Sequence, residues 1–163
     1  GGFNYKWAIL REVLANTTKI IERTFPGVPV LPLIGDTDNI FYWHIPDTAA
    51  IKGQVYSDIG EVFFGSRSAI PPSFSEGGYY RKDLVGGKMT ILALNSIAWN
   101  ARNEMGIGPS RDSIRQLDWL EKQLKDNAAL KENDRKVFVL AMHIPPGLSY
   151  DASLTNLTQD EKT

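Results

Sequence analysis

Three side chains that can ligate a cation or transfer a proton follow apolar segments of this 163-residue sequence. Asp36 and Asp38 come just after the apolar run 28–34, and His143 comes directly after the run 136–142. In open α/β sheets, ligands bind beyond the carboxyl ends of the strands. We therefore expect these side chains to meet at one edge of a sheet. Each also has a plainer interpretation, since a turn aspartate bonds to backbone amides and a histidine at a strand end can simply make one hydrogen bond.

The surrounding pattern predicts an α/β (α+β) domain in which both apolar strands follow a helix. Helical spacing of apolar residues predicts three helices. Continuous apolar runs predict two buried strands, of which 28–34 contains two prolines that are unusual in a central strand. A glycine pair at residues 86–87 predicts a β-hairpin. The predicted elements are a helix over 5–23, a strand over 28–34, a helix carrying Ile51, Val55, Ile59, Val62 and Phe63, a loop over 66–75, hairpin strands over 78–85 and 88–95, an irregular stretch over 97–111, a helix over 112–130 that buries Ile114, Leu117, Leu120 and Leu124, and a strand over 136–142.

The bulk composition is typical of a single globular domain. Hydrophobic residues make up 42% and charged residues 23% of the chain, and the formal net charge is −1 with both signs mixed along the sequence. This distribution indicates neither a nucleic-acid partner nor a polybasic membrane patch, and no apolar run is long enough to span a bilayer. The sequence has no cysteine, which excludes disulfides, a thiol nucleophile and a thiolate metal site.

Two N-glycosylation sequons are present, Asn16-Thr17-Thr18 and Asn156-Leu157-Thr158. Such triplets are acceptor sites on the surfaces of secreted proteins. They also occur by chance, and the first lies in a predicted helix rather than a loop. Asn16 and Asn156 are therefore candidate glycosylation sites, and they point towards the secretory pathway.

Four motifs occur in an order that resembles the acid sphingomyelinase branch of the calcineurin-like metallophosphoesterases. In that branch one strand ends in Gly-Asn-His-Asp or Gly-Asn-His-Glu, a Leu-x-x-Asn strand and a Gln-x-x-Trp-Leu helix follow, and a later strand ends in His-Ile-Pro-Pro-Gly. The last motif, with the Trp-Leu helix before it, is the most specific part of the resemblance. The matching segments here are Pro29-Val30-Leu31-Pro32-Leu33-Ile34-Gly35-Asp36-Thr37-Asp38, Leu92-Ala93-Leu94-Asn95, Gln116-Leu117-Asp118-Trp119-Leu120 and His143-Ile144-Pro145-Pro146-Gly147.

This resemblance implies a two-metal site, usually zinc, in a four-layer fold of β-sheets flanked by helices. Only two of the family's ligands map onto this sequence: Asp36 takes the place of the asparagine of Gly-Asn-His, and His143 takes the place of a lone histidine. The family's Asp-x-His and Gly-Asp motifs, which precede this stretch in the family, and its Gly-His-x-His motif, which follows it, are absent. Residues 1–163 are therefore expected to be the central part of one catalytic domain. The resemblance further implies a phosphate-ester or phospholipid substrate and, together with the sequons, a secreted, lysosomal or vesicular location.

Two positions depart from the family pattern at the expected site. Asp36 replaces an amide with a carboxylate, which can still ligate zinc but adds negative charge and should blunt the Lewis acidity of the ion. Thr37 replaces the family histidine thought to protonate the leaving oxygen, and a threonine hydroxyl cannot act as a general acid near neutral pH. Either the substrates have good leaving groups, or another residue supplies the proton, or the protein is not a catalyst. His44, the only other histidine, is a candidate for that role, although a histidine beside aromatic residues more often packs in a loop.

The remaining candidates have supporting roles. Asp38 matches the acidic residue of the family motif and could orient neighbouring ligands, or it could only close the turn. Asn95 follows a predicted strand and could tie down the loop that carries the site. The aromatic clusters Phe41-Tyr42-Trp43 and Tyr79-Tyr80 could line an apolar substrate groove, but aromatic residues at this density more often belong to the core.

The sequence leaves two functions open. The first is a metal-dependent phosphodiesterase in the longer parent protein, and the second is a non-catalytic relative that binds a phosphate ligand or a partner. Residues 1–163 alone supply Asp36 and His143 at most, and two ligands do not hold a zinc ion. We therefore expect this chain by itself to bind no metal tightly and to be inactive. Open strand edges also predict self-association.

Overall fold

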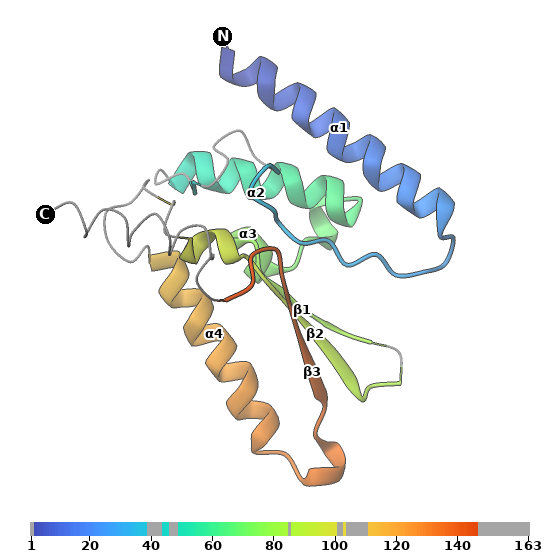
Figure 1. The fold of residues 1–163 in the computed structure, drawn as a ribbon, viewed down its shortest axis with the longest axis vertical. Coiled ribbons are helices and arrows are strands. Elements are labelled where there is room, and N and C mark those ends of the chain that lie inside the picture. Colours follow the sequence, from blue (N-terminus) through green and yellow to red (C-terminus); the bar gives the residue numbers. More distant parts are fainter. Residues whose placement is uncertain are drawn as a thin grey trace, which may run out of the picture.

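The computed structural model describes residues 2–38, 44–45, 49–84, 86–100, 103 and 111–146. Within these ranges the chain forms four α-helices, three short 3-10 helices and a three-stranded mixed sheet (Figure 1). This mixture confirms the predicted α/β class, while the four-layer arrangement stays a prediction. None of the described helices is long and apolar enough to cross a membrane. The elements are α1 (Gly2–Thr24), α2 (Ala49–Phe64), η1 (Arg67–Ala69), α3 (Pro72–Gly77), β1 (Tyr80–Asp83), β2 (Met89–Leu94), η2 (Ser96–Trp99), α4 (Arg111–Ala128), η3 (Glu132–Asp134) and β3 (Val137–Met142).

The sheet has the strand order β1-β2-β3. β1 and β2 form the predicted antiparallel hairpin, and Gly86 and Gly87 turn the chain between them with φ angles of 89° and 68°. These left-handed angles favour glycine because it has no Cβ. β3 pairs with β2 in parallel, with Leu140 opposite Leu92. A parallel pair needs a crossover connection, and α4 supplies it.

The core lies where α2, α3 and the sheet meet. α2 lies between α1 and α3, and α3 packs on the start of the sheet (Figure 1). Phe74 is fully buried, and its ring lies edge-on to the rings of Tyr56, Phe64 and Tyr80. Edge-to-face pairs add to the stabilisation that burial of these large rings provides. Tyr79 and Tyr80 are only 3% and 2% exposed, so this cluster belongs to the core and does not line a groove.

The predicted strand over 28–34 is not formed. Residues 28–35 run as irregular chain outside the sheet. The physical reason is that Pro29 and Pro32 have no N–H to donate to a ladder. The segment is held instead by the Tyr80 hydroxyl, which donates to the carbonyl of Pro32 at 2.9 Å, and by Ile34, which is 2% exposed.

The predicted loop over 66–75 is also wrong, because it contains η1 and most of α3. α3 begins at Pro72, a position where the missing N–H of proline costs nothing and its fixed φ suits a helix. It ends at Gly77 and is capped by Gly78, which has a left-handed φ of 75° and donates its N–H to the carbonyl of Phe74.

The predicted burial of the helix over 112–130 and of the strand over 136–142 is wrong within the described part of the chain. α4 contacts the rest of the protein largely through polar and aromatic side chains, among them Asp112, Gln116 and Trp119. β3 forms one edge of the described sheet. The large apolar side chains that remain more than one-third exposed in these two ranges are Ile114, Leu117, Leu124, Leu130, Val137, Val139 and Leu140. No described segment covers this surface.

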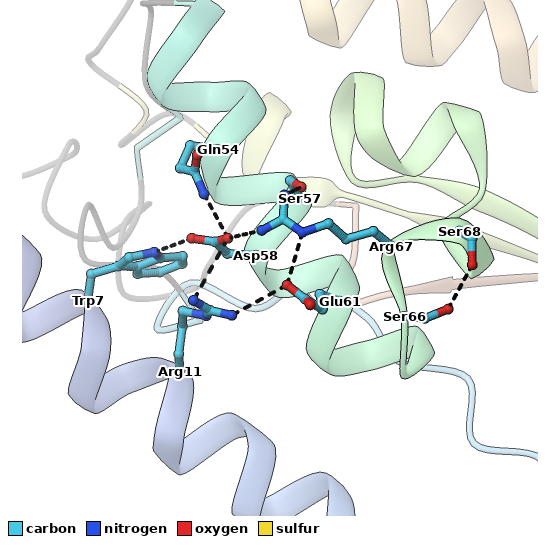
Figure 2. Close-up of polar contacts among 9 residues, drawn as sticks. All are labelled: Trp7, Arg11, Gln54, Ser57, Asp58, Glu61, Ser66, Arg67 and Ser68. Atoms are coloured by element: carbon cyan, nitrogen blue, oxygen red, sulfur yellow. Dashed lines mark hydrogen bonds and ion pairs between the residues drawn. The ribbon is translucent and has the colours of Figure 1, made fainter.

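A buried carboxylate fixes α2 to α1 and η1 (Figure 2). Asp58 is 3% exposed; it accepts hydrogen bonds from Trp7 Nε1 at 2.8 Å and Gln54 Nε2 at 2.7 Å, and it pairs with Arg67 at 3.0 Å. Burial alone raises the pKa of Asp58. The hydrogen bonds from Gln54 and Trp7 and the charges of Arg11 and Arg67 outweigh that effect, and the pKa lies below its ordinary value.

We predict that Asp58→Asn lowers the free energy of unfolding at pH 7 by roughly 2 kcal/mol, because charge-assisted hydrogen bonds to a buried group are lost. The pKa of Asp58 is lower in the folded state than in the unfolded state. The carboxylate therefore contributes its full stabilisation of the fold above the unfolded pKa of about 3.9, and this contribution is lost as pH falls through the folded pKa. Urea denaturation at pH 7 and below pH 4 should show the difference between wild type and variant shrinking with acid.

The control is Glu61→Gln. Glu61 also pairs with Arg67 but its side chain is 39% exposed, so its replacement should change the free energy of unfolding by less than about 1 kcal/mol. Equal losses for the two variants would contradict a special role for burial at Asp58.

Candidate metal-binding site

The turn at Gly35–Asp38 and the residue after β3 meet at the carboxyl end of the sheet. His143 Nε2 lies 3.0 Å from Asp36 Oδ1, although the two residues are 107 positions apart. The expectation that this carboxylate and this imidazole lie side by side is confirmed. The side chain of His143 is 45% exposed and that of Asp36 is 19% exposed, so the pair is open to solvent.

Asp38 closes the turn that presents Asp36. Its Oδ2 accepts the N–H of Gly35 at 2.6 Å. A Cβ added to Gly35 would lie 3.3 Å from that Oδ2 and 3.4 Å from Nδ1 of His143. Glycine therefore allows the turn carboxylate and the imidazole to approach the same stretch of backbone. The turn role of Asp38 is seen directly, and a role in orienting ligands stays a prediction.

Asn95, directly after β2, is the centre of a buried hydrogen-bond network. Its Nδ2 donates to the Tyr56 hydroxyl at 3.1 Å and to the carbonyl of Gly77 at 3.0 Å, and its Oδ1 accepts the N–H of Ile97. Gln116 of α4 completes the network: its Oε1 accepts the N–H of Asn95 at 2.7 Å and its Nε2 donates to the Asn95 carbonyl at 3.0 Å. Asn95 and Gln116 are 1% and 0% exposed. The network thus ties β2 to α2, α3 and α4. A role of Asn95 in tying down the loop that carries the site stays a prediction.

Ser96 connects this network to the imidazole. It is 4% exposed, and its Oγ accepts the N–H of Ile144 at 2.8 Å. Ile144 directly follows His143, so the backbone that carries the imidazole is fixed to the residue after Asn95. Sequence reasoning missed Ser96, because nothing local in the sequence distinguishes a buried serine from one in an exposed turn.

The structure describes two of the other candidates, His44 and Asn16, and the rest lie outside the described residues. His44 is half-buried and lines a small pocket together with Ile34, Tyr56 and Asn95. Its compensating catalytic role stays a prediction. Asn16 is exposed on α1. The segment 41–43 and the second sequon at Asn156 lie outside the described residues, as does Gly147 at the end of the last motif.

Asp36 and His143 fit part of a zinc site. Two ligands on a tetrahedral ion, each at about 2.0–2.1 Å from it, stand roughly 3.3 Å apart, which is close to the observed 3.0 Å between Nε2 and Oδ1. Among the described residues, however, no group of three or more His, Cys, Asp or Glu side chains could hold a metal ion. The two side chains therefore suit a metal as members of a larger ligand set.

Comparison with known proteins finds similarity to several phosphodiesterases. It is 30% identical over 139 residues to cyclic GMP-AMP phosphodiesterase SMPDL3A of Rattus norvegicus, covering 83% of the chain and 29% of that protein. It is 28% identical over 141 residues to sphingomyelinase phosphodiesterase C of Dictyostelium discoideum, covering 85% of the chain and 29% of that protein. It is 29% identical over 144 residues to human acid sphingomyelinase-like phosphodiesterase 3b, covering 86% of the chain and 30% of that protein. No family model matches the sequence.

These similarities confirm the resemblance predicted from the motifs. The chain is related to the acid sphingomyelinase-like phosphodiesterases over most of its length. It spans about 30% of the length of the curated relatives that it matches.

We predict that Gln116→Met lowers the free energy of unfolding by about 3 kcal/mol, because it leaves the buried N–H and carbonyl of Asn95 unpaired at about 1–3 kcal/mol each. The matched control on the same helix is Gln123→Met. The hydrogen bond that Gln123 accepts from Arg81 is exposed, so its replacement should cost less than about 0.5 kcal/mol. Urea denaturation measures both. Similar losses for the two variants would contradict the importance of the buried network.

Proposed function

We propose that this chain is part of a metal-dependent phosphodiesterase in which Asp36 and His143 are two of the metal ligands. The proposal rests on one observation: these two groups, 107 positions apart, lie 3.0 Å from each other at the carboxyl end of the sheet. Both positions correspond to ligand positions of the family motif. Similarity to proteins named as cyclic GMP-AMP and sphingomyelinase phosphodiesterases supports hydrolysis of a phosphodiester in the longer protein.

The substrate class proposed is a phosphodiester of a small molecule or a phospholipid. Divalent ions, zinc in the family pattern, would supply an activated water and stabilise the charge that develops on the phosphoryl oxygens. In this chain, His143 would offer a neutral ring nitrogen, the form of imidazole that ligates metals. The hydrogen bond from Ile144 N to Ser96 Oγ would keep that ring in place. Asp36 would add a negative charge that an asparagine ligand lacks.

The turn has no histidine at position 37 that could protonate the leaving oxygen. Thr37 is exposed in the turn beside Asp36, and its hydroxyl does not release a proton near neutral pH. The catalyst would therefore act best on phosphodiesters with good leaving groups. The same residue favours the second candidate function, a non-catalytic relative that binds a phosphate ligand or a partner.

We also propose that the chain by itself associates with a second copy through the open edge at β3. Val137, Val139 and Leu140 are 61%, 39% and 46% exposed there, and an apolar edge strand presents unpaired backbone groups that can extend a sheet. A secreted, lysosomal or vesicular location is a separate proposal, supported by the family resemblance and by the two sequons.

The test of function uses the complete protein and compares an aryl phosphodiester with an alkyl phosphodiester. Measured kcat/KM should be higher for the aryl substrate, whose leaving group needs no proton. His143→Asn should lower kcat/KM for both by at least about 100-fold, with loss of metal by elemental analysis. Full activity in this variant would contradict the assignment of His143 as a ligand.

Thr37→His in the same protein should raise hydrolysis of the alkyl ester by about 100-fold, the lower end of what a general acid supplies, and change the aryl ester little. Thr24→His, at the exposed end of α1, is the control for a histidine placed elsewhere. If neither substrate is cleaved while phosphate binding is retained, the non-catalytic function replaces the enzymatic one.

For the present chain alone we predict no tight zinc binding, because two ligands do not hold the ion. Zinc should be removed by dialysis against buffer, and elemental analysis should find much less than one ion per chain. Stoichiometric zinc that is retained by the wild type and lost in His143→Asn would overturn this prediction.

A further inference from the structure

α1 is joined to the rest of the protein by an exposed segment that begins with a tight turn. Residues 25–30 are all exposed, and Phe25, Val28 and Val30 are 55%, 59% and 39% exposed. The N–H of Val28 donates to the carbonyl of Phe25 at 3.2 Å, and Gly27 has a left-handed φ of 77°. Proline at the second position and glycine at the third are typical of a type II turn. This turn reverses the chain after α1, which lies on the outer side of α2 (Figure 1).

The contacts that dock α1 pair a few of its side chains with side chains of α2. Trp7 is 7% exposed and donates to the buried carboxylate of Asp58 at 2.8 Å, and Arg11 lies 3.5 Å from Glu61 (Figure 2). If α1 left this position, Trp7 would lose its burial and the carboxylate of Asp58 would lose a hydrogen bond. A detached α1 is therefore unfavourable unless an equivalent α2 accepts it.

We propose that two copies of this chain exchange α1, so that the α1 of each copy docks on the α2 of the other. The turn at residues 25–28 is the hinge that opens. Exchange restores every contact between α1 and α2, because the accepting surface has the same sequence in both copies. Residues 25–30 in an extended conformation span roughly 20 Å, which lets α1 reach a neighbouring copy. Two opened hinge segments that lie side by side would also cover the exposed side chains of Phe25, Val28 and Val30.

This exchanged dimer differs from the association through the edge of β3 proposed above. Exchange uses α1 and the hinge, and it leaves β3 and the pair Asp36–His143 as they are. A lysine on an edge strand opposes edge-to-edge pairing. The exchange is therefore tested in a Val139→Lys background, where association through β3 is weakened and the hinge is unchanged.

Cross-linking distinguishes an exchanged dimer from any other dimer. The chain has no cysteine, so Arg11→Cys and Glu61→Cys together introduce the only two thiols, at positions where α1 contacts α2. This variant is refolded from urea at high concentration, and monomer and dimer are separated by size-exclusion chromatography. A flexible bismaleimide should link the monomer within one chain and should convert the exchanged dimer into a covalent dimer on a denaturing gel. A dimer fraction that yields only internally linked single chains, or the absence of a dimer fraction, would overturn the proposal.

The hinge is tested with two glycines that differ mainly in their position. Gly27 and Gly86 have left-handed φ angles of 77° and 89°, and a Cβ added to either would meet no atom within 4 Å. Alanine strains the backbone at such an angle. The turn at residues 25–28 is open in the exchanged dimer, so Gly27→Ala should raise the dimerisation constant by at least about tenfold in sedimentation equilibrium. Gly86→Ala strains the hairpin in monomer and dimer alike and should change this constant by less than about twofold. Equal effects of the two variants, or no effect of Gly27→Ala, would contradict the proposal.

Discussion

The constraint on which the structure depends is the hydrogen-bonded pairing of Gln116 with the backbone of Asn95. Both side chains are buried, so any polar group left without a partner would carry its full desolvation cost. In the structure these groups are all paired: Gln116 spans the N–H and carbonyl of Asn95, and the Asn95 amide reaches Tyr56 and Gly77. Apolar packing alone would tolerate small shifts of α2, α3 and α4. The amide contacts specify one relative position.

The hydrogen bonds between Asn95 and Gln116 also help to position the candidate site. Ser96 follows Asn95 and holds the backbone of Ile144, so the end of β3 is attached to the end of β2. On the other side, Ile34 is buried next to Gly78, where a side chain on the glycine would collide with it. Ile34 thus helps to position the turn that carries Asp36, and Ser96 helps to position the backbone that carries the imidazole of His143.

The sequence predicted what local patterns encode. The helices α1, α2 and α4 and the hairpin follow from apolar spacing and from the glycines at 86–87. The side-by-side placement of Asp36 and His143 was predicted from the carboxyl ends of two strands, of which only β3 is formed. The strand over 28–34 failed because hydrophobicity was given more weight than Pro29 and Pro32. Periodicity does not encode tertiary neighbours. It therefore could not predict how exposed the side chains of α4 and β3 are, or the contact between Trp7 and Asp58, which are 51 positions apart.

The distance along the chain between Asp36 and His143 has a kinetic consequence. Bringing them together closes a segment of 107 positions. The chain loses conformational entropy in this closure before the contact between the two side chains can stabilise it. The parallel pairing of β2 with β3 is likewise non-local, and topologies of high contact order fold slowly. The two halves of the site should therefore come together late in folding. A cation that requires both of them would bind the finished fold and act on its equilibrium rather than guide its early steps.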